Sequence, residues 1–102
     1  MSPRILAFDT SGPYCAAALL DGDTLLAQVD DMPKGQAEHI MGLLEDLLAK
    51  AVLSWGNLDA LAVGTGPGNF TGVRISVAAA RGLAMGLNIP AYGVNGLSLI
   101  HI

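Results

Sequence analysis

Only one cysteine, Cys15, occurs in the 102 residues, so the chain cannot form an internal disulfide and suits a reducing compartment. Basic residues are also scarce: five Lys and Arg stand against nine Asp and Glu, for a formal net charge of -4. They do not cluster, so the basic footprint expected of direct nucleic-acid binding is missing. A charged leader followed by an apolar run is missing too, as is any apolar stretch long enough to span a bilayer. We therefore expect a cytoplasmic protein that does not contact a membrane.

Residues suited to catalysis or metal binding are equally few. The two histidines, His39 and His101, have no second ligand at helical spacing, whereas a metal site needs two or three converging ligands. His39 therefore suits a solvated helix position, and Cys15, among alanines, suits a buried strand position. No Ser-His-Asp or Cys-His set can be assigned. We expect no metal, no cofactor and no catalytic residue.

The residues that are present predict one small α/β domain spanning residues 1–102. The composition is 52% hydrophobic and 14% charged, which is apolar for a small domain and typical of a chain with an interface. Apolar runs bounded by turn residues predict strands over residues 4–8, 14–20, 24–29, 58–63 and 91–94. Apolar residues spaced three and four apart predict helices over residues 36–52 and 71–87.

The order of these elements predicts a mixed five-stranded sheet. The first three strands are joined by turns, with Asp21-Gly22 a strong hairpin signal, and so form an antiparallel meander. The last two strands each follow a helix and join in parallel by right-handed crossovers. The predicted strand order is therefore 3-2-1-4-5, with the strand at 58–63 beside the strand at 4–8.

Two turns contain the residues that most resemble a ligand-binding site. Asp9, Thr10 and Ser11 follow the first strand, where nucleotide-binding lobes of this topology hold phosphate with hydroxyl and backbone N–H groups. The same three residues also suit a turn that satisfies its own backbone. The next glycine-rich run lacks the Lys of a Walker loop and the last Gly of a dinucleotide loop. A structural turn is preferred there, formed by Gly64, Gly66, Pro67, Gly68 and Asn69.

The second helix carries small residues at every fourth position, namely Gly72, Ser76, Ala80 and Ala84. A strip of small side chains lets another helix approach closely. The approaching neighbour is either the first helix of the same domain or a helix of a partner protein. The sequence leaves both alternatives open.

Three segments together resemble a known family. They are residues 5–11 (Ile-Leu-Ala-Phe-Asp-Thr-Ser), residues 34–48, and residues 66–75 (Gly-Pro-Gly-Asn-Phe-Thr-Gly-Val-Arg-Ile). The last is similar to the Gly-Pro-Gly-Ser-Phe-Thr-Gly-Leu/Val-Arg-Ile signature of the bacterial TsaB (YeaZ) family. The resemblance covers most of the chain, from Arg4 to about Gly96. It implies a lobe of the actin/hexokinase/Hsp70-like (ribonuclease H-like) superfamily, which has the topology predicted above.

The resemblance also implies a function. TsaB proteins are needed to make threonylcarbamoyladenosine at position 37 of tRNAs, while the paralogue TsaD carries the metal and the catalysis. TsaB pairs with TsaD through its N-terminal lobe, and the ATPase TsaE docks on the pair. TsaB keeps a degenerate nucleotide site, which in this sequence corresponds to Asp9, Thr10 and Ser11. The chain is thus expected to be a non-catalytic subunit that meets tRNA only indirectly and that can also form a homodimer.

We expect the partner contact on the two helices, with the strip of small residues on the second helix facing outward so that dispersion contacts accumulate along it. The residues assigned to this interface are Gln36, His39, Ile40, Leu43, Leu47, Thr71, Gly72, Ile75, Ser76, Ala79, Ala80 and Leu83.

The sequence also departs from the family pattern. Family members often have His at the position of Gln36 and Ser at that of Asn69, and the TsaD metal pair falls on Gln36 and Ile40, which cannot form that site. Members are about twice as long, so the second lobe is expected to be absent and residues 97–102 to be a truncated or non-native tail. The rival functions are a kinase or ATPase lobe of the same superfamily, and a metallopeptidase, whose ligands the sequence lacks.

Overall fold

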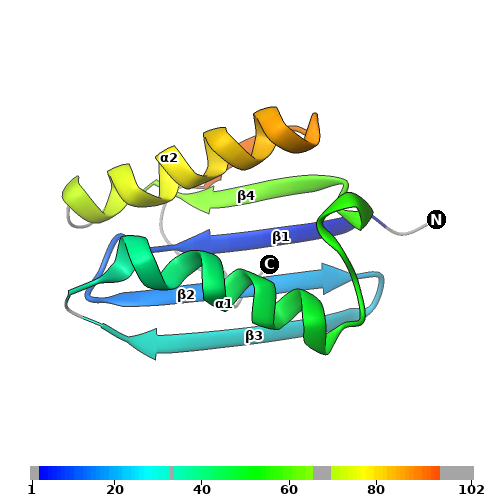
Figure 1. Cartoon of the computed structure of the whole chain (residues 1–102), viewed down its shortest axis with the longest axis horizontal. Coiled ribbons are helices and arrows are strands. Elements are labelled where there is room, and N and C mark those ends of the chain that lie inside the picture. Colours follow the sequence, from blue (N-terminus) through cyan, green and yellow to red (C-terminus); the bar gives the residue numbers. More distant parts are fainter. Residues whose placement is uncertain (1–2, 33, 66–69, 95–102) are drawn as a thin grey trace.

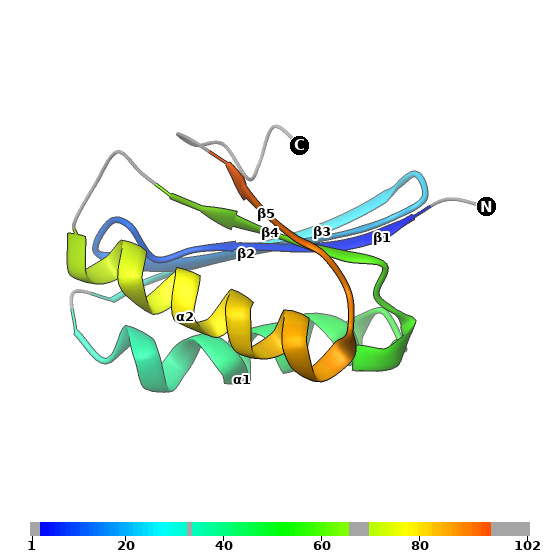
Figure 2. The ribbon, with the colours of Figure 1, turned by 90° about the horizontal axis from the view of Figure 1, so that it is seen from above.

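A computed structural model of the chain describes residues 3–32, 34–65 and 70–94. These residues form a five-stranded sheet with both α-helices on one of its faces (Figures 1 and 2). Among the described residues, neither helix has the combination of length and apolar character that crossing a membrane requires. The elements in chain order are β1 (Arg4–Asp9), β2 (Tyr14–Asp21), β3 (Thr24–Asp31), α1 (Gln36–Lys50), the short 3-10 helix η1 (Trp55–Asn57), β4 (Ala60–Gly64), α2 (Phe70–Leu87) and β5 (Ala91–Val94).

The strand order is β3-β2-β1-β4-β5, which confirms the order predicted from the sequence. β1, β2 and β3 form an antiparallel meander, and β4 and β5 join in parallel after their helices. Asp21 pairs with Thr24, so the turn consists of Gly22 and Asp23, one residue later than the Asp21-Gly22 signal indicated. Gly22 has φ of 63°, a conformation that glycine adopts without a steric penalty.

The core lies between the sheet and the two helices. α1 buries its whole apolar stripe, because each of Ile40, Leu43, Leu44, Leu47 and Leu48 is at most 3% exposed. These side chains pack against residues of β1, β2 and β4 such as Phe8, Leu19 and Leu61. Burying one such side chain stabilises a fold by about 1.5–3 kcal/mol. α1 is therefore held to the sheet by its own sequence periodicity.

Several element ends differ from the predicted ranges by one or two residues, and two of these differences have a clear cause. α1 ends at Lys50, two residues early, because Val52 turns to φ 58° and Leu53 N–H donates back to the Leu48 carbonyl at 2.9 Å. β4 begins at Ala60, because Leu58 caps the end of η1 and the pairing with β1 starts where Ala60 lies opposite Ile5. The backbone N–H of Ser54 donates to the Asn57 side chain at 2.8 Å and so closes the start of η1.

The second face of the sheet is also apolar. Ala7, Ala16, Ala18 and Ala62 gather there and are at most 9% exposed, with Ile5, Tyr14 and Val94 packed against them. No α-helix within residues 3–32, 34–65 and 70–94 covers this face (Figure 2). The sheet therefore has a helix-covered face and a second face that no α-helix of the described chain covers.

Candidate functional site

The turn after β1 uses its hydrogen-bonding groups internally. The Thr10 N–H donates to Ser76 Oγ at 2.9 Å, and the Thr10 hydroxyl donates to the Gly72 carbonyl at 2.6 Å. Because the Thr10 hydroxyl has only one proton, the Ser76 hydroxyl is the donor in their 2.5 Å contact. Both side chains are 0% exposed. The hydroxyl and N–H that would hold a phosphate are thus bonded to α2.

Asp9 and Ser11 complete this internal arrangement. The Ser11 N–H donates to Asp9 Oδ1 at 2.7 Å, which is the side-chain turn that Asp commonly forms with the backbone two residues on. Asp9 is only 6% exposed and lies against Gly64, where a Cβ atom would come within 2.5 Å of its carboxyl carbon. The geometry matches the structural interpretation of the turn. A degenerate nucleotide site at Asp9, Thr10 and Ser11 stays a prediction.

Glycine at position 72 lets α2 touch the turn. A Cβ atom there would lie 1.9 Å from the Thr10 carbonyl oxygen, which is well inside van der Waals contact. Of the predicted structural loop, only Gly64 lies within the described residues. Gly66, Pro67, Gly68 and Asn69 lie outside them, as does the predicted tail at residues 97–102.

The side chain of Gln36 is a contact that sequence reasoning missed. From the first turn of α1, its amide nitrogen points at the carbonyl oxygens of Thr10, Gly12 and Tyr14, at 3.3, 2.7 and 2.5 Å. Three acceptors around one amide NH2 fix which end of the amide faces them. The only signal in the sequence was that this position departs from the family's usual His, and that signal gave no contact partner.

An open groove lies between α1 and α2. Its volume is about 510 Å³, and it is lined by Ala37, Ile40, Met41, Thr71, Arg74, Ile75, Ala78 and Ala79. A second groove of about 550 Å³ on α2 shares Arg74 and Ala78 with the first and adds Val73, Val77 and Arg81. The two grooves therefore form one mainly apolar surface, which we call the helix groove, with two arginines along α2.

The structure sorts the predicted interface residues into two groups. Leu43, Leu47, Gly72, Ser76 and Ala80 are buried inside the domain, as is most of Ile40, which still lines the groove. The exposed or half-exposed members are Gln36, His39, Thr71, Ile75, Ala79 and Leu83.

The expected outward direction of the small strip is wrong. Gly72 and Ser76 face the turn after β1, and Ala80 packs into the core of the domain. The small side chains let α2 approach the turn after β1 and the core of its own domain. This contact differs from both neighbours that the spacing suggested, the first helix of the domain and a helix of a partner. Whether the exposed members contact a partner stays a prediction.

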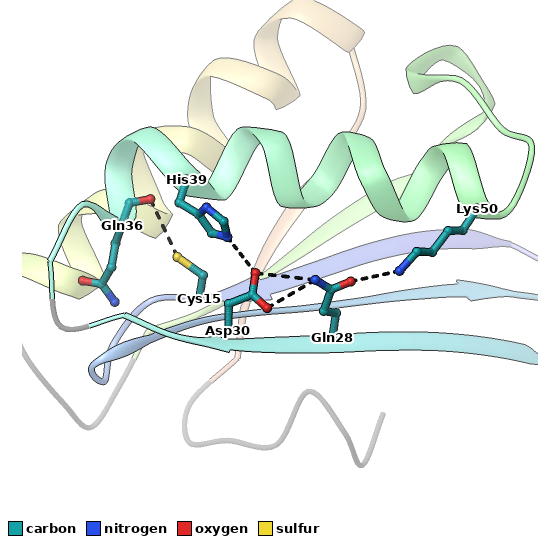
Figure 3. Close-up of polar contacts among 6 residues, drawn as sticks. All are labelled: Cys15, Gln28, Asp30, Gln36, His39 and Lys50. Carbon is teal, nitrogen blue, oxygen red and sulfur yellow. Dashed lines mark hydrogen bonds and ion pairs between the residues drawn. The ribbon is translucent and has the colours of Figure 1, made fainter.

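A polar network ties α1 to β3 on the other side of the helix (Figure 3). His39 Nε2 lies 2.7 Å from Asp30 Oδ2, Gln28 Nε2 donates to Asp30 at 3.2 Å, and Lys50 Nζ donates to Gln28 Oε1 at 3.1 Å. The hydrogen bonds from His39 and then Gln28 lower the pKa of Asp30 below its ordinary value. His39 is half-exposed, as predicted, but it is paired with Asp30, which the sequence did not reveal.

Cys15 is a buried strand residue, which confirms the prediction. Burial, together with the nearby charge of Asp30, raises the pKa of its thiol above the usual value. The thiol donates weakly to the Gln36 backbone carbonyl at 3.8 Å (Figure 3). Among the described residues, no three His, Cys, Asp or Glu side chains come together as a metal site would require.

The strand order, the paired helices on one face and the turn after β1 define a lobe of the actin/hexokinase-like superfamily. The family model described as "TsaD: tRNA N6-adenosine threonylcarbamoyltransferase" matches residues 32–101. The Escherichia coli K12 protein named "tRNA threonylcarbamoyladenosine biosynthesis protein TsaB" is 40% identical over 94 residues, and the protein of that name from Haemophilus influenzae is 35% identical over 94 residues. These alignments cover 92% of this chain and 41% and 40% of the two relatives.

A comparison with solved structures leads to the same family. A structure of YeaZ from Pseudomonas aeruginosa superposes with a TM-score of 0.90 at 38% sequence identity, covering 94% of this chain and 45% of that one. The chain therefore belongs to the TsaB (YeaZ) family, within the larger family that the TsaD model describes. It spans 40–45% of the length of these relatives.

Proposed function

We propose that the chain acts in threonylcarbamoyladenosine biosynthesis as a non-catalytic subunit that docks a TsaD-type catalytic subunit in the helix groove. The names of its relatives support the pathway. The observation that carries the docking role is the groove itself, an open volume of about 510 Å³ with a mainly apolar lining between α1 and α2. An exposed apolar patch of this kind on a small domain is typical of a protein contact.

The internal bonding of the turn supports the non-catalytic part of the proposal. A phosphate bound at Thr10 would have to replace hydrogen bonds that are 2.6–2.9 Å long and buried. The rival ATPase or kinase lobe needs those same groups for its nucleotide. We therefore assign the turn a structural role and leave phosphate and metal chemistry to the partner, with a TsaE-type ATPase and tRNA reached only through the complex in the cytoplasm.

The groove also suggests what the partner presents. Met41, Ile75 and Ala78 are apolar, and Arg74 and Arg81 lie along α2. We expect the docked surface to be an apolar helix face with a carboxylate placed toward Arg81, because such pairing steers association and fixes orientation.

Two alanine-to-tryptophan variants test the docking surface. Ala78→Trp fills the groove at an exposed position of α2, whereas Ala27→Trp makes the same change at an exposed position of β3, on the second face of the sheet. With a purified TsaD-type subunit, calorimetry should show that Ala78→Trp weakens binding at least tenfold while Ala27→Trp binds like the parent chain. Equal binding by both folded variants would remove the groove from the interface. A parent chain that does not bind at all would remove the proposed function.

A further inference from the structure

The N-terminal ends of α1 and α2 are both tied to the turn that joins β1 to β2. α1 reaches it through the Gln36 amide, which donates to the carbonyls of Thr10, Gly12 and Tyr14. α2 reaches it through Gly72 and Ser76, which bond the hydroxyl and the N–H of Thr10. One short turn therefore makes direct polar contacts with both helices.

These hydrogen bonds lie at one end of the groove, and the residues that form them are adjacent in sequence to residues that line it. Ala37 follows Gln36, Thr71 precedes Gly72, and Ile75 precedes Ser76. α1 and α2 share the core beneath the groove and leave about 510 Å³ open between them at the surface. At this end the turn adds polar contacts to the packing of both helices on the sheet, and so contributes to the separation of the helices.

The hydrogen bonds between the turn and α2 are shielded from water. Thr10 and Ser76 are 0% exposed, so water does not replace a missing partner without a rearrangement. The Gln36 amide is half-buried, and its two N–H groups are shared among three carbonyl oxygens within 3.3 Å. Removing either contact is expected to release the turn from one helix while most of the core stays in place.

We propose that residues 10–14 act as a clamp that fixes the width of the helix groove, and that Gln36 and Thr10 are positioning residues for docking. This inference rests on the proposed docking function. The groups that hold phosphate in nucleotide-binding lobes of this topology here hold α2. Because a preformed groove spares the partner the cost of selecting a minor conformation, the apparent Kd scales inversely with the fraction of molecules whose groove is correctly spaced.

The groove width can be measured without any partner. In a Cys15→Ala background, spin labels at Ala37→Cys and Ala78→Cys report the distance across the groove by electron paramagnetic resonance. Thr10→Val, which keeps the shape and removes the hydroxyl, and Gln36→Met, which keeps the length and removes the amide, should each shift or broaden that distance. Thr10→Ser, which keeps the hydroxyl, should leave the distance at the parent value. Unchanged distances in both folded variants would overturn the clamp.

A matched control separates positioning from general stability. Leu58→Ala removes a core side chain that is 4% exposed and does not line the groove, so it should lower stability without changing the distance. If it changes the distance as much as Thr10→Val does, the clamp is wrong. Should Thr10→Val fail to fold, the half-buried Gln36→Met still decides between the two results.

Binding to a TsaD-type subunit gives the functional readout. Thr10→Val and Gln36→Met are expected to raise the Kd about tenfold, which corresponds to about 1.4 kcal/mol, whereas Thr10→Ser and Leu58→Ala should stay near the parent value. Folded clamp variants that bind like the parent chain would refute the clamp and leave the docking proposal standing. If the parent chain itself does not bind, the docking proposal fails, and the clamp is then tested by the distance measurement alone.

Discussion

Gly72 and Gly82 are both glycines of α2, but only Gly72 meets another part of the described chain. A Cβ atom at position 72 would lie 1.9 Å from the Thr10 carbonyl oxygen, whereas a Cβ at position 82 meets nothing within 4 Å. Alanine at either position gives the helix a similar gain in propensity, up to about 1 kcal/mol. The difference between Gly72→Ala and Gly82→Ala therefore isolates the cost of separating α2 from the turn.

The size of that cost follows from the contacts. The colliding neighbour is backbone, so either α2 or the turn has to move, and the 2.6 Å and 2.9 Å bonds of Thr10 to Gly72 and Ser76 lengthen or break. A buried polar group left without its partner costs about 1–3 kcal/mol. Because two such bonds are disturbed, the cost is about 2–6 kcal/mol, and after a gain in propensity of up to about 1 kcal/mol we expect Gly72→Ala to lower the free energy of unfolding by about 1–6 kcal/mol. Gly82→Ala should be neutral or stabilising by up to about 1 kcal/mol.

Urea unfolding followed by circular dichroism measures both variants. Each midpoint should move at constant m-value, downward for Gly72→Ala and slightly upward for Gly82→Ala. The expected loss is a large share of the roughly 5–15 kcal/mol typical of a small domain, so it lies well above the error of the method. Equal midpoints for the two variants would refute the close approach of α2 to the turn.

Three further predictions follow from the described contacts. Leu43→Ala should destabilise the domain by about 2–5 kcal/mol in the same urea assay, because Leu43 is 1% exposed in the core. Asp30 has a lowered pKa in the folded chain, so its charge stabilises the fold above pH 3.8, and this stabilisation is lost as the pH falls through the lowered pKa. In Asp30→Asn the urea midpoint should therefore depend less on pH over that acidic range. Cys15, buried and with a raised pKa, should react with a thiol reagent only as the domain unfolds, and rapid labelling of the native chain would contradict its placement.

The sheet and the first helix could be predicted because their signals are local. Apolar runs marked the strands, and the spacing from Ile40 to Leu48 fixed which side of α1 meets the sheet. Chain order and crossover handedness then left one arrangement in which β4 lies beside β1.

The polar contacts of the turn could not be predicted because they join distant residues. Thr10 and Ser76 are 66 residues apart, and nothing in the sequence around either residue indicates the other as its hydrogen-bond partner. α2 also misled sequence reasoning, since Val73 and Val77 are half-exposed while Ser76 and Ala80 are buried. A helix with apolar or small residues on most sides does not reveal from spacing alone which side faces inward.

Hydrogen–deuterium exchange on mixing with a TsaD-type subunit tests the docking claim most directly. Docking in the helix groove predicts new protection in the two segments that line it, residues 37–41 and 71–79, and unchanged exchange in β3. Protection confined to β3 or to the second face of the sheet, or binding without added protection in either groove segment, would contradict the account.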